Sequence, residues 1–527
     1  MSSNLIVRCG LVSLLLSALS LPAFAQSFRV DCPTSTITHP TAANNVKELP
    51  YIKPTYTGVQ GYATTPNPTV VNGAIKCQQI SGGDGYATMG DGTQTYMFSF
   101  GPLSGLADIA NGLPGTQFPD VFNTPIGAPP VAGDPATTLD ASGGTFTYNG
   151  AIGIVPNVDA NGGNGTATAP IDGHVDARPI LDVGVMNGNI PAPLMAIDED
   201  DEFFLTLSNV GMIQRPDLFE QHTVHFHGYP NASAFYDGVP DASVAINIGA
   251  SFTYYYLAPD AGTYFWHCHI TPPEHLQMGM VGQLYVRPRQ NRVPTTTTLY
   301  AALQNQQLDP RTACNSADIL CSNPLPAVVT TATGGGKYAY NDGDGSTGYD
   351  VEYPLQIHGF DPNFHFVGMT FNPEGFTDMK DKYFLLNGRS YPDTVIPGSL
   401  QTESTDASYH FSQPLPSIIN IPVGGRALLR ISDLDVSEYQ TLASLGIPMT
   451  VIGYNAKLLR DQAGNNMYYN TNSITLAGGE SLDVILDASN MTNFPKGSVF
   501  YLYTPNLDHL SNDAENFGGL MTEVHIN

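Results

Sequence analysis

The amino-acid sequence predicts an all-β protein with two β-sandwiches in tandem. Short segments of alternating apolar residues recur between residues 180 and 287 and again after residue 380, and turn residues separate them about every 8 to 12 positions. The 527 residues include 53 glycines and 41 prolines, together with many Val, Thr, Tyr and Phe residues, which is typical of strands joined by turns. Helix signals are sparse, so the all-β class is favoured.

The chain is expected to divide into five consecutive parts. Residues 26–94 look irregular, TYMFSF (95–100) looks like a first strand, and 104–176, rich in Gly, Pro, Asn, Asp and Ala, looks like a long surface insertion. The expected parts are a signal peptide (1–25), an N-terminal extension with the first strand and the insertion (26–176), the first sandwich (177–290), a linker (291–378) and the second sandwich (379–527).

The N-terminus predicts export. Arg8 precedes the apolar run LVSLLLSALSL, and Ala23-Phe24-Ala25 has the small-x-small form that a signal peptidase cleaves, so the mature chain is expected to begin at Gln26. No later run approaches the roughly 18 apolar residues that a membrane-spanning helix needs. We therefore expect an exported protein, periplasmic or extracellular, without a membrane anchor.

The charge balance excludes two classes of partner. The chain holds 20 Lys and Arg residues against 47 Asp and Glu residues, which gives a formal net charge of -27. Such a surface repels the phosphates of nucleic acids and the headgroups of anionic membranes. We therefore expect neither nucleic acid nor a membrane surface as a partner.

The cysteines of an exported chain are expected to form disulfides, because the compartment is oxidising. Cys314 and Cys321 flank a short loop and could form one bridge, while Cys32 and Cys77 could form another. Cys268 is then left over, since Cys9 is removed with the signal peptide. An odd cysteine in a secreted protein is either reactive or bound to something.

Histidines surround this leftover cysteine in two segments, QHTVHFHG (221–228) and WHCHITPPEHLQMGM (266–280). If both segments are strands, their side chains alternate between two faces. One face then gathers His222 and Cys268, joined by His275 and Met280 from the following loop. The opposite face gathers four imidazoles, which are His225, His227, His267 and His269.

These two groups have the chemistry of copper sites. Two imidazoles, a thiolate and a weak methionine ligand form the trigonal type 1 site that transfers single electrons, and neutral imidazoles suit copper at a second site. A thiolate bound to metal is protected from disulfide formation, which accounts for Cys268. A structural zinc site would explain neither Met280 nor eight candidate ligands. The backbone around Cys268 would also be a short covalent path between the two sites.

The segments GVMNGNIPAPLMAIDEDDEFFLTLSN, HTVHFHG, YDGVPDASVAINIGASFTYYY, AGTYFWHCHI and EHLQMGMVGQLYV resemble a cupredoxin domain of the multicopper oxidases, and more distantly the copper nitrite reductases, over residues 180–287. The resemblance implies Greek-key sandwiches and a copper cofactor of type 1 plus type 2/3. It assigns the type 1 copper to His222, Cys268, His275 and Met280, and half of the type 2/3 cluster to His225, His227, His267 and His269.

Two methionines and one aspartate near these ligands differ in the roles that the resemblance implies. Met280, five residues after His275, is at the axial spacing, whereas Met278 is expected to pack. Asp237 resembles a carboxylate near the cluster that orients a ligand or relays protons, although it could equally be a turn residue before Gly238.

The second sandwich resembles the copper-free middle domain of a three-domain oxidase through YFLLNGRSYPD, IPVGGRALLRISD, IPMTVIGYNAK and SITLAGGESLDVILDAS. Two features depart from the family. The loop from Cys268 to His275 is two residues longer than the usual oxidase spacing, and no second set of paired histidines is visible. The histidines in the C-terminal part of the chain are solitary and are expected to lie at the surface or to pack, namely His358, His365, His410, His509 and His525.

Three functions follow from the resemblance. The favoured one is an oxidase that takes electrons from a phenol or a metal ion and reduces dioxygen to water, with the cluster completed by a neighbouring subunit, built differently or incomplete. The second is a nitrite-reductase-like enzyme, although that family carries an acid at the position of His225 and a small residue at that of His269. The third is a noncatalytic copper-binding protein that transfers electrons.

Overall fold

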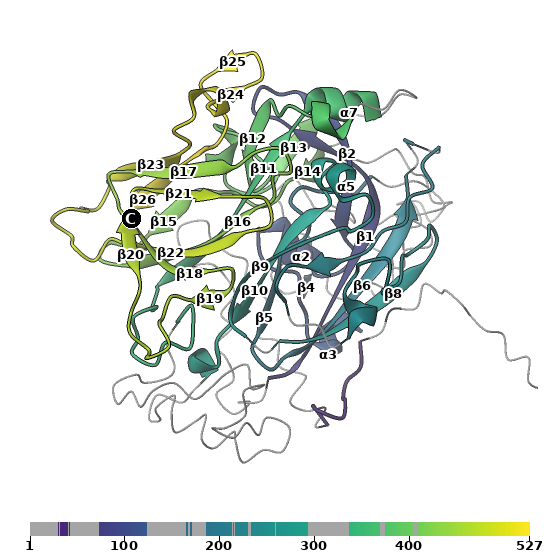
Figure 1. The fold of residues 1–527 in the computed structure, drawn as a ribbon, viewed down its shortest axis with the longest axis horizontal. Coiled ribbons are helices and arrows are strands. Elements are labelled where there is room, and N and C mark those ends of the chain that lie inside the picture. Colours follow the sequence, from purple (N-terminus) through teal and green to yellow (C-terminus); the bar gives the residue numbers. More distant parts are fainter. Residues whose placement is uncertain are drawn as a thin grey trace, which may run out of the picture.

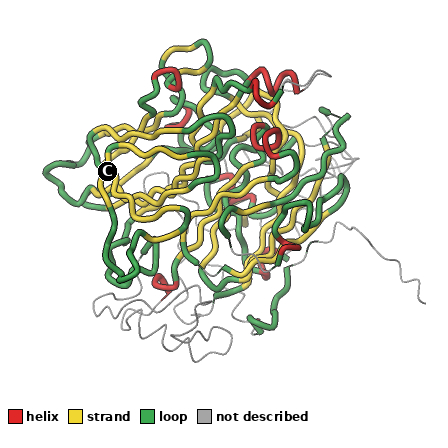
Figure 2. Tube along the Cα trace, viewed as in Figure 1, coloured by secondary structure: helices red, strands yellow, loops and turns green. Residues whose placement is uncertain are grey.

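The computed structural model contains two β-sandwiches that lie side by side (Figure 1). Strands form most of the regular secondary structure and the helices are short (Figure 2), so the all-β prediction is confirmed. The predicted signal peptide, most of the predicted insertion and the Cys314–Cys321 pair lie outside the described residues. The structure describes residues 30, 32–40, 42, 73–123, 165–166, 169–170, 186–212, 214–215, 217–229, 233–258, 260–292, 337–368, 375–403 and 409–527.

The first sandwich consists of two four-stranded sheets with the strand orders β2-β1-β6-β8 and β5-β10-β9-β7. Between them lies an apolar core that includes Phe98, Phe100, Trp266 and Cys268. The strands are β1 (Ile75–Thr88), β2 (Gln94–Pro102), β5 (Met195–Asp198), β6 (Glu202–Gly211), β7 (His225–Phe226), β8 (Ser251–Leu257), β9 (Gly262–His267) and β10 (Val281–Arg287).

The prediction that residues 26–94 are irregular is wrong for β1. This strand pairs in parallel with β6 and antiparallel with β2. Its sequence contains SGGDG, which suggests a turn, but the glycines serve close approach instead. A Cβ on Gly82 would lie 2.6 Å from the His222 ring, and one on Gly85 would lie 2.1 Å from the Gly188 carbonyl oxygen. The glycines therefore let neighbouring groups pack directly against the strand.

The start of the predicted surface insertion also packs into the first sandwich. It forms α2 (Leu106–Ala110) and α3 (Pro119–Phe122), and Gln117 bridges to Cys77 of β1. Phe122 is buried beside the Cys32–Cys77 disulfide. The prediction of a surface loop is thus wrong for this part, because its leucine, isoleucine and phenylalanine side chains extend the core.

The second sandwich has a nine-stranded sheet ordered β19-β18-β22-β16-β11-β12-β24-β25, with β20 on β18, and a five-stranded sheet ordered β15-β26-β23-β17-β21. The strands are β11 (Val351–Phe360), β12 (Tyr383–Leu386), β15 (Ile419–Ile421), β16 (Arg426–Asp433), β17 (Gln440–Leu445), β18 (Met449–Tyr454), β19 (Lys457–Leu458), β20 (Tyr469–Thr471), β21 (Ser473–Leu476), β22 (Ser481–Asp487), β23 (Val499–Tyr503), β24 (Ser511–Asn512), β25 (Glu515–Asn516) and β26 (Met521–Ile526).

Strand β11 lies in the segment expected to be a linker, yet it is a central strand between β16 and β12. All its residues are buried, including the polar Glu352, Gln356 and His358, so the strand is covered on both faces. The remaining elements are two hairpins and several short helices. They are β3 (Gly165–Thr166), β4 (Ala169–Pro170), β13 (Leu400–Glu403), β14 (Tyr409–Ser412), α5 (Pro272–Gln277), α7 (Pro362–Gly368), and the 3-10 helices η2 (Ala234–Tyr236), η3 (Arg289–Arg292), η4 (Phe376–Asp378), η5 (Asp393–Val395) and η6 (Leu507–His509).

A buried ionic network joins the two sandwiches. Glu352 of β11 accepts hydrogen bonds from Arg287 of β10 at 3.0 Å and from Arg430 of β16 at 2.9 Å. Burial alone would raise the pKa of Glu352, but the two guanidinium groups hold it at about 2. Gln283 of β10 donates to the Arg430 carbonyl at 2.9 Å. These contacts fix β10, which lies beside β9, against the second sandwich.

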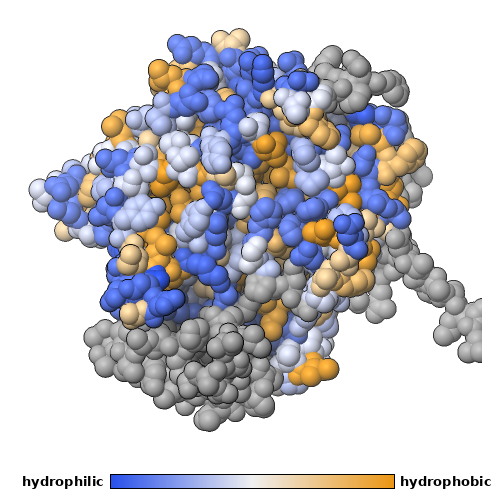
Figure 3. Space-filling view, in the orientation of Figure 1, coloured by the Kyte–Doolittle hydropathy of each residue, from blue (hydrophilic) through white to orange (hydrophobic). Residues whose placement is uncertain are grey.

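The Cys32–Cys77 disulfide predicted from the sequence is present, and Cys268 is the free buried cysteine among the described residues. Within the described ranges, we find no helix long and apolar enough to cross a membrane. On the face drawn in Figure 3, hydrophobic residues are scattered among hydrophilic ones.

Candidate metal centres

The first centre brings together His222, Cys268 and His275 from three separate segments. His222 bridges to Ile246 before β7, Cys268 directly follows β9, and His275 lies in α5. All three ligand residues are fully buried, and their donor atoms lie within 4.8 Å of one another. The Cys268 Sγ atom is 3.2 Å from Nδ1 of His275 and 4.0 Å from Nδ1 of His222.

Backbone hydrogen bonds hold this centre together. The Thr223 amide donates to Cys268 Sγ at 3.4 Å, and the Cys268 amide donates to the Met280 carbonyl at 3.1 Å. The Met280 amide in turn donates to the His275 carbonyl at 2.8 Å. Met280 and Met278 are both buried in the core cluster of Cys268. The preference for Met280 over Met278 as axial ligand therefore stays a prediction.

The donor set fits a copper ion, because a thiol and two imidazoles converge in a buried space. The Nε2 atom of His222 is buried without a hydrogen-bond partner among the described residues, and its Nδ1 faces only the distant sulfur. A buried imidazole whose nitrogens lack good hydrogen-bond partners lowers the stability of the fold. A metal held by Nδ1 and Sγ would remove part of that cost.

Three residues around this centre were missed by the sequence reasoning. Phe98 of β2 packs against the His275 ring at 5.1 Å, and Gly82 of β1 leaves room for His222. The Glu220 carboxylate lies 3.7 Å from Nε2 of His275. The sequence signal that could have identified Glu220 is its position two residues before His222. Phe98 and Gly82 carry no such signal, because they come from strands of the other sheet.

The two histidines of this centre differ in electrostatics. Burial lowers the pKa of His222 well below its usual range. Burial also lowers the pKa of His275, but Cys268 and Glu220 outweigh it and raise the value to about 9. In the metal-free protein, the charges around His275 therefore favour a cation there.

The second centre gathers His225, His227 and His267, whose donor atoms lie within 4.8 Å of one another. It forms because β7 pairs with β9 in a register that places His225 opposite His267. The Nε2 atoms of His227 and His267 are 2.9 Å apart. The His269 ring lies beside this group, with its centre 5.0 Å from that of His225 and 5.5 Å from that of His267.

Backbone groups orient these imidazoles. Nδ1 of His225 contacts the Asp237 carbonyl at 2.7 Å, and Nδ1 of His267 contacts the Cys268 carbonyl at 2.6 Å. Because a carbonyl only accepts hydrogen bonds, each Nδ1 carries the proton and each Nε2 lone pair is left free. The His227 ring hydrogen-bonds to the backbone of Gly479, which belongs to the second sandwich.

Converging nitrogen lone pairs repel one another unless a proton or a metal lies between them, so this arrangement also fits a copper ion. Burial, reinforced by neighbouring imidazoles, lowers the pKa of His227 to about 4 and that of His267 well below its usual range. Both rings are therefore neutral at neutral pH, which is the form that binds metal.

Asp237 caps η2 and is partly exposed. Its backbone carbonyl is the group in hydrogen-bond contact with His225, whereas its carboxylate oxygen is 3.6 Å from the same Nδ1. The sequence suggested either a carboxylate near the cluster or a turn residue, but not this main-chain contact, which depends on the turn geometry and not on the residue type.

The remaining predicted histidines lie apart from both centres. His509 is buried and stacks on Phe384 at 3.7 Å, and His525 hydrogen-bonds to Glu523. His358 and His365 are buried near the end of α5, while His410 lies in β14. In the described part of the chain, no third group of His, Cys, Asp or Glu has metal-binding geometry.

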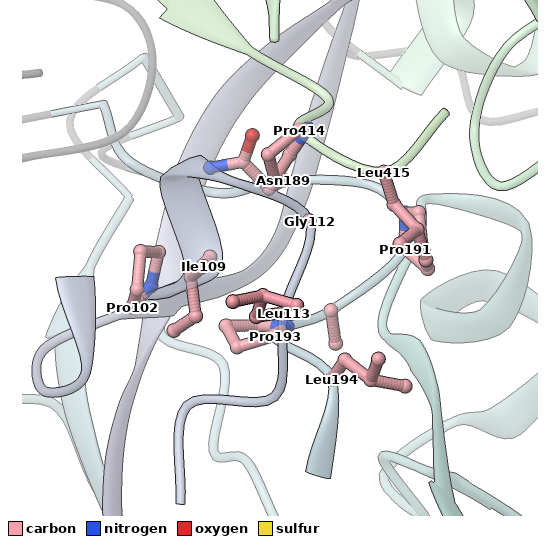
Figure 4. A pocket seen from close by; sticks show the side chains of 11 residues that line it. Pro102, Ile109, Gly112, Leu113, Asn189, Pro191, Pro193, Leu194, Pro414 and Leu415 are labelled. Carbon is pink, nitrogen blue, oxygen red and sulfur yellow. The ribbon is translucent and has the colours of Figure 1, made fainter. Parts of the chain in front are cut away.

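A pocket near Pro191 is distinct from both centres (Figure 4). Its side chains are mainly proline and leucine, with Asn189 as the polar member. Asn189 is already hydrogen-bonded to the Gln413 amide and to the Asn187 carbonyl. This pocket therefore offers no chemistry to the metal centres.

Residues 171–291 match the family model described as Multicopper oxidase. Multicopper oxidase MCE of Talaromyces pinophilus is 34% identical over 120 residues, which is 22% of this chain and 18% of that protein. Laccase-1 of Emericella nidulans is 32% identical over 173 residues, or 31% of this chain and 25% of that protein. The solved Blue Copper Oxidase from Nitrosomonas europaea has a TM-score of 0.43 at 21% identity, covering 64% of this chain and 78% of its own.

The region that matches the multicopper oxidase family model is the sandwich that carries both histidine groups. Copper is the metal that the family implies, in agreement with the donor sets. The match spans about a fifth to a quarter of the length of these two relatives.

Proposed function

We propose that the protein is a multicopper oxidase that takes electrons from a reducing substrate, a phenol or a metal ion, and passes them to dioxygen to give water. One observation supports this function above the others. Two groups of metal-binding side chains lie on either side of the Cys268 backbone. The site that would accept electrons from the substrate and the site that would donate them to dioxygen therefore lie at the end of the same strand.

The first group would hold type 1 copper through His222, Cys268 and His275, with Met280 as the axial ligand. The second group would hold its half of the type 2/3 cluster through His225, His227, His267 and His269. Copper at the first group would accept single electrons, and copper at the second would support four-electron reduction of dioxygen. The chain itself buries the first group and keeps His227 and His267 of the second group neutral.

The path between the groups is short. His267 and His269 are the covalent neighbours of Cys268. The His267 Nδ1–H also donates to the Cys268 carbonyl at 2.6 Å, which adds a hydrogen-bonded route from the thiolate residue to the second group. The Thr223 hydroxyl accepts from the His269 amide at 2.9 Å and helps to fix this segment.

The reductant would approach the first group from the side of Glu220. This carboxylate faces the outer nitrogen of His275 and is partly exposed. The nearby Glu274 has its pKa raised by burial, with a further contribution from Glu220. Acidic groups at this position suit a metal cation or a phenolic hydroxyl that donates a hydrogen bond.

A second copy of the chain would complete the second centre. His225 and His227 are only half-buried, and the described part of the second sandwich offers no paired histidines to them. A homo-oligomer in which another copy covers this side is therefore part of the proposal. Size-exclusion chromatography with light scattering, combined with copper counting, tests it: a copper-loaded monomer with a full cluster would contradict it.

Export through the predicted signal peptide also belongs to this proposal. The Cys32–Cys77 disulfide supports it, because such bonds persist in oxidising compartments. Fractionation of cells that express the full chain would test export, and a protein that stays in the cytoplasm with reduced cysteines would contradict it.

Copper analysis with visible and EPR spectra is the decisive test of function. About four copper ions per chain support the oxidase, about two support a nitrite-reductase-like enzyme, and one supports an electron carrier. The thiolate-to-copper absorption should vanish in Cys268→Ser. Met280→Leu should alter that absorption, whereas the matched control Met278→Leu should leave it unchanged. A colourless protein that holds zinc would overturn the proposal.

A further inference from the structure

The C-terminal end of α5, the helix that carries His275, is held by the second sandwich. His358 of β11 donates from Nε2 to the Leu276 carbonyl at 2.8 Å. Nε2 of His365, in α7, lies 2.9 Å from the Gln277 carbonyl, while its Nδ1 lies 2.5 Å from the Tyr96 carbonyl of β2, so His365 links α5 to both sandwiches. Both histidines are buried. The sequence reasoning assigned them no role beyond surface or packing.

The side chain of Gln277 is held by the same sandwich. Its Nε2 donates to an Asp381 oxygen at 2.9 Å, and its Oε1 accepts from the Asp361 amide at 3.0 Å. Gln277 is fully buried, and both partners are nearly so. Both ends of the amide group are thus anchored to residues of the second sandwich.

These contacts add donors at the end of the helix, where the Leu276 carbonyl also accepts from the Gly279 amide at 3.0 Å. The last carbonyls of any helix lack partners within it, and a buried carbonyl without a donor is costly. A helix of six residues is too short to be stable alone, so tertiary contacts determine its position. The second sandwich supplies those contacts one and two residues after His275.

The position of α5 is transmitted directly to the first centre. The His275 carbonyl accepts from the Met280 amide, and the Met280 carbonyl accepts from the Cys268 amide. His222 and Cys268 are instead placed by the first sandwich, through the bridge to Ile246 and through β9. The His222 and Cys268 side of the centre is therefore positioned by the first sandwich, whereas the His275 side is held by both, since Phe98 and Ser99 of β2 contact the His275 ring and the Gly279 carbonyl.

We infer that the second sandwich, which contributes no member to the first histidine–cysteine group within the described residues, helps to position the His275 and Met280 side of that centre through Gln277 and His358. This inference rests on the proposed type 1 copper. It gives the second sandwich a role in setting the geometry of that copper, and hence its reduction potential, which depends on ligand placement.

Three variants with a matched control test this inference in the full-length, copper-loaded protein. His358→Leu removes the donor to Leu276, and His358→Gln restores an amide donor at a similar reach. Gln277→Asn keeps the polarity but shortens the side chain, so that it no longer reaches both partners. His509→Leu removes an equally buried histidine of the second sandwich that does not contact α5.

We expect His358→Leu and Gln277→Asn to retain copper but to shift the type 1 EPR spectrum and reduction potential, with His358→Gln close to wild type. His509→Leu should lower the unfolding temperature and leave the type 1 spectrum unchanged. In the copper-free protein, hydrogen exchange at residues 278–280 should be faster in His358→Leu than in His509→Leu.

Two outcomes separate this inference from the proposed function. A wild-type protein with a type 1 spectrum that is unchanged in both His358→Leu and Gln277→Asn would overturn the inference and leave the function intact. A wild-type protein without that spectrum would overturn the function. If His358→Leu does not fold, Gln277→Asn and the hydrogen exchange of its copper-free form decide the question.

Discussion

The two metal centres differ in how completely this chain encloses them. The residues of the first centre are all fully buried, whereas in the second only His267 is buried and His225 and His227 remain half-exposed. The three residues that could hold a metal at the first centre all come from this chain. The second centre has a more exposed side, which the proposed second copy of the chain would cover.

The centres also differ in what holds their outer nitrogens. In the first, the outer nitrogen of His275 faces the carboxylate of Glu220. In the second, the outer nitrogens of His225 and His267 donate to backbone carbonyls. A charged partner stabilises positive charge at the first centre, while neutral carbonyls fix ring orientation at the second.

The largest expected effect is the selective loss of the second centre in His267→Ala. Removal of a central imidazole should release the copper held there, and oxidase activity should fall below detection. The type 1 absorption should persist, because Cys268, His222 and His275 keep their contacts. Copper counting and visible spectra of the same sample check this. Parallel loss of the blue absorption would show that the two centres are not separable.

Acid should weaken both centres together, because the Glu352 network joins the sandwiches that hold them. The folded-state pKa of Glu352 is about 2, below its ordinary value of 4.5, so its stabilisation is present above pH 4.5 and is lost as the pH falls toward 2. By linkage this amounts to about 3 kcal/mol of unfolding free energy.

Urea unfolding of wild type and Glu352→Gln between pH 6 and pH 3 measures this contribution. The variant should be less stable at pH 6, and the gap should narrow as the pH falls. A constant gap across this range would contradict the assigned pKa. The difference between the two proteins removes the titration of other carboxyl groups, such as Glu202, whose pKa is also held at about 2.

Two glycines provide a matched pair of perturbations, one for each centre. A Cβ on Gly82 would lie 2.6 Å from the His222 ring, and one on Gly479 would lie 2.8 Å from the His227 ring. We expect Gly82→Ala to weaken copper binding at the first centre, and Gly479→Ala at the second, by about 10- to 100-fold. Chelator competition followed by EPR measures each centre separately.

Gly424→Ala is the control for backbone strain, because Gly424 shares the positive φ of Gly479 and its Cβ would meet only Met491 at 3.7 Å. It should destabilise the fold slightly without changing copper affinity at either centre. If Gly82→Ala and Gly479→Ala each lowered copper affinity equally at both centres, neither glycine would act only on the centre beside it.

The smallest expected effect is that of Asp237→Ala. The main-chain carbonyl at this position still accepts from His225 after the carboxylate is removed, so copper affinity at the second centre should fall about tenfold or less. Asp237→Asn should behave in the same way. A much larger loss in both variants would show that the carboxylate, and not the carbonyl, orients His225.

Sequence reasoning reached the parts of the site that depend on local spacing. Strand alternation around Cys268 predicts which histidines share a face, because side-chain direction has a period of two along a strand. The odd cysteine count singles out Cys268, and the present disulfide is one of the predicted pairs. Both inferences need only the positions of residues along the chain.

The sequence missed elements whose role depends on distant partners. Strand β1 was taken as irregular because its glycines suggest turns, and β11 was assigned to a linker. Glycines in β1 are tolerated because other segments pack into the space they leave. Hydrophobic periodicity cannot reveal such packing, since the partner lies more than a hundred residues away in the chain.

By itself, the sequence determined the fold class, the family resemblance and the two sets of candidate ligands, because strand periodicity and ligand spacing are local properties. Only the tertiary structure decided that Gly479 contacts His227 and that Gln277 is anchored to Asp381 and Asp361. These contacts join segments far apart in the chain, and they exist because buried polar groups on one sandwich require partners that the other supplies.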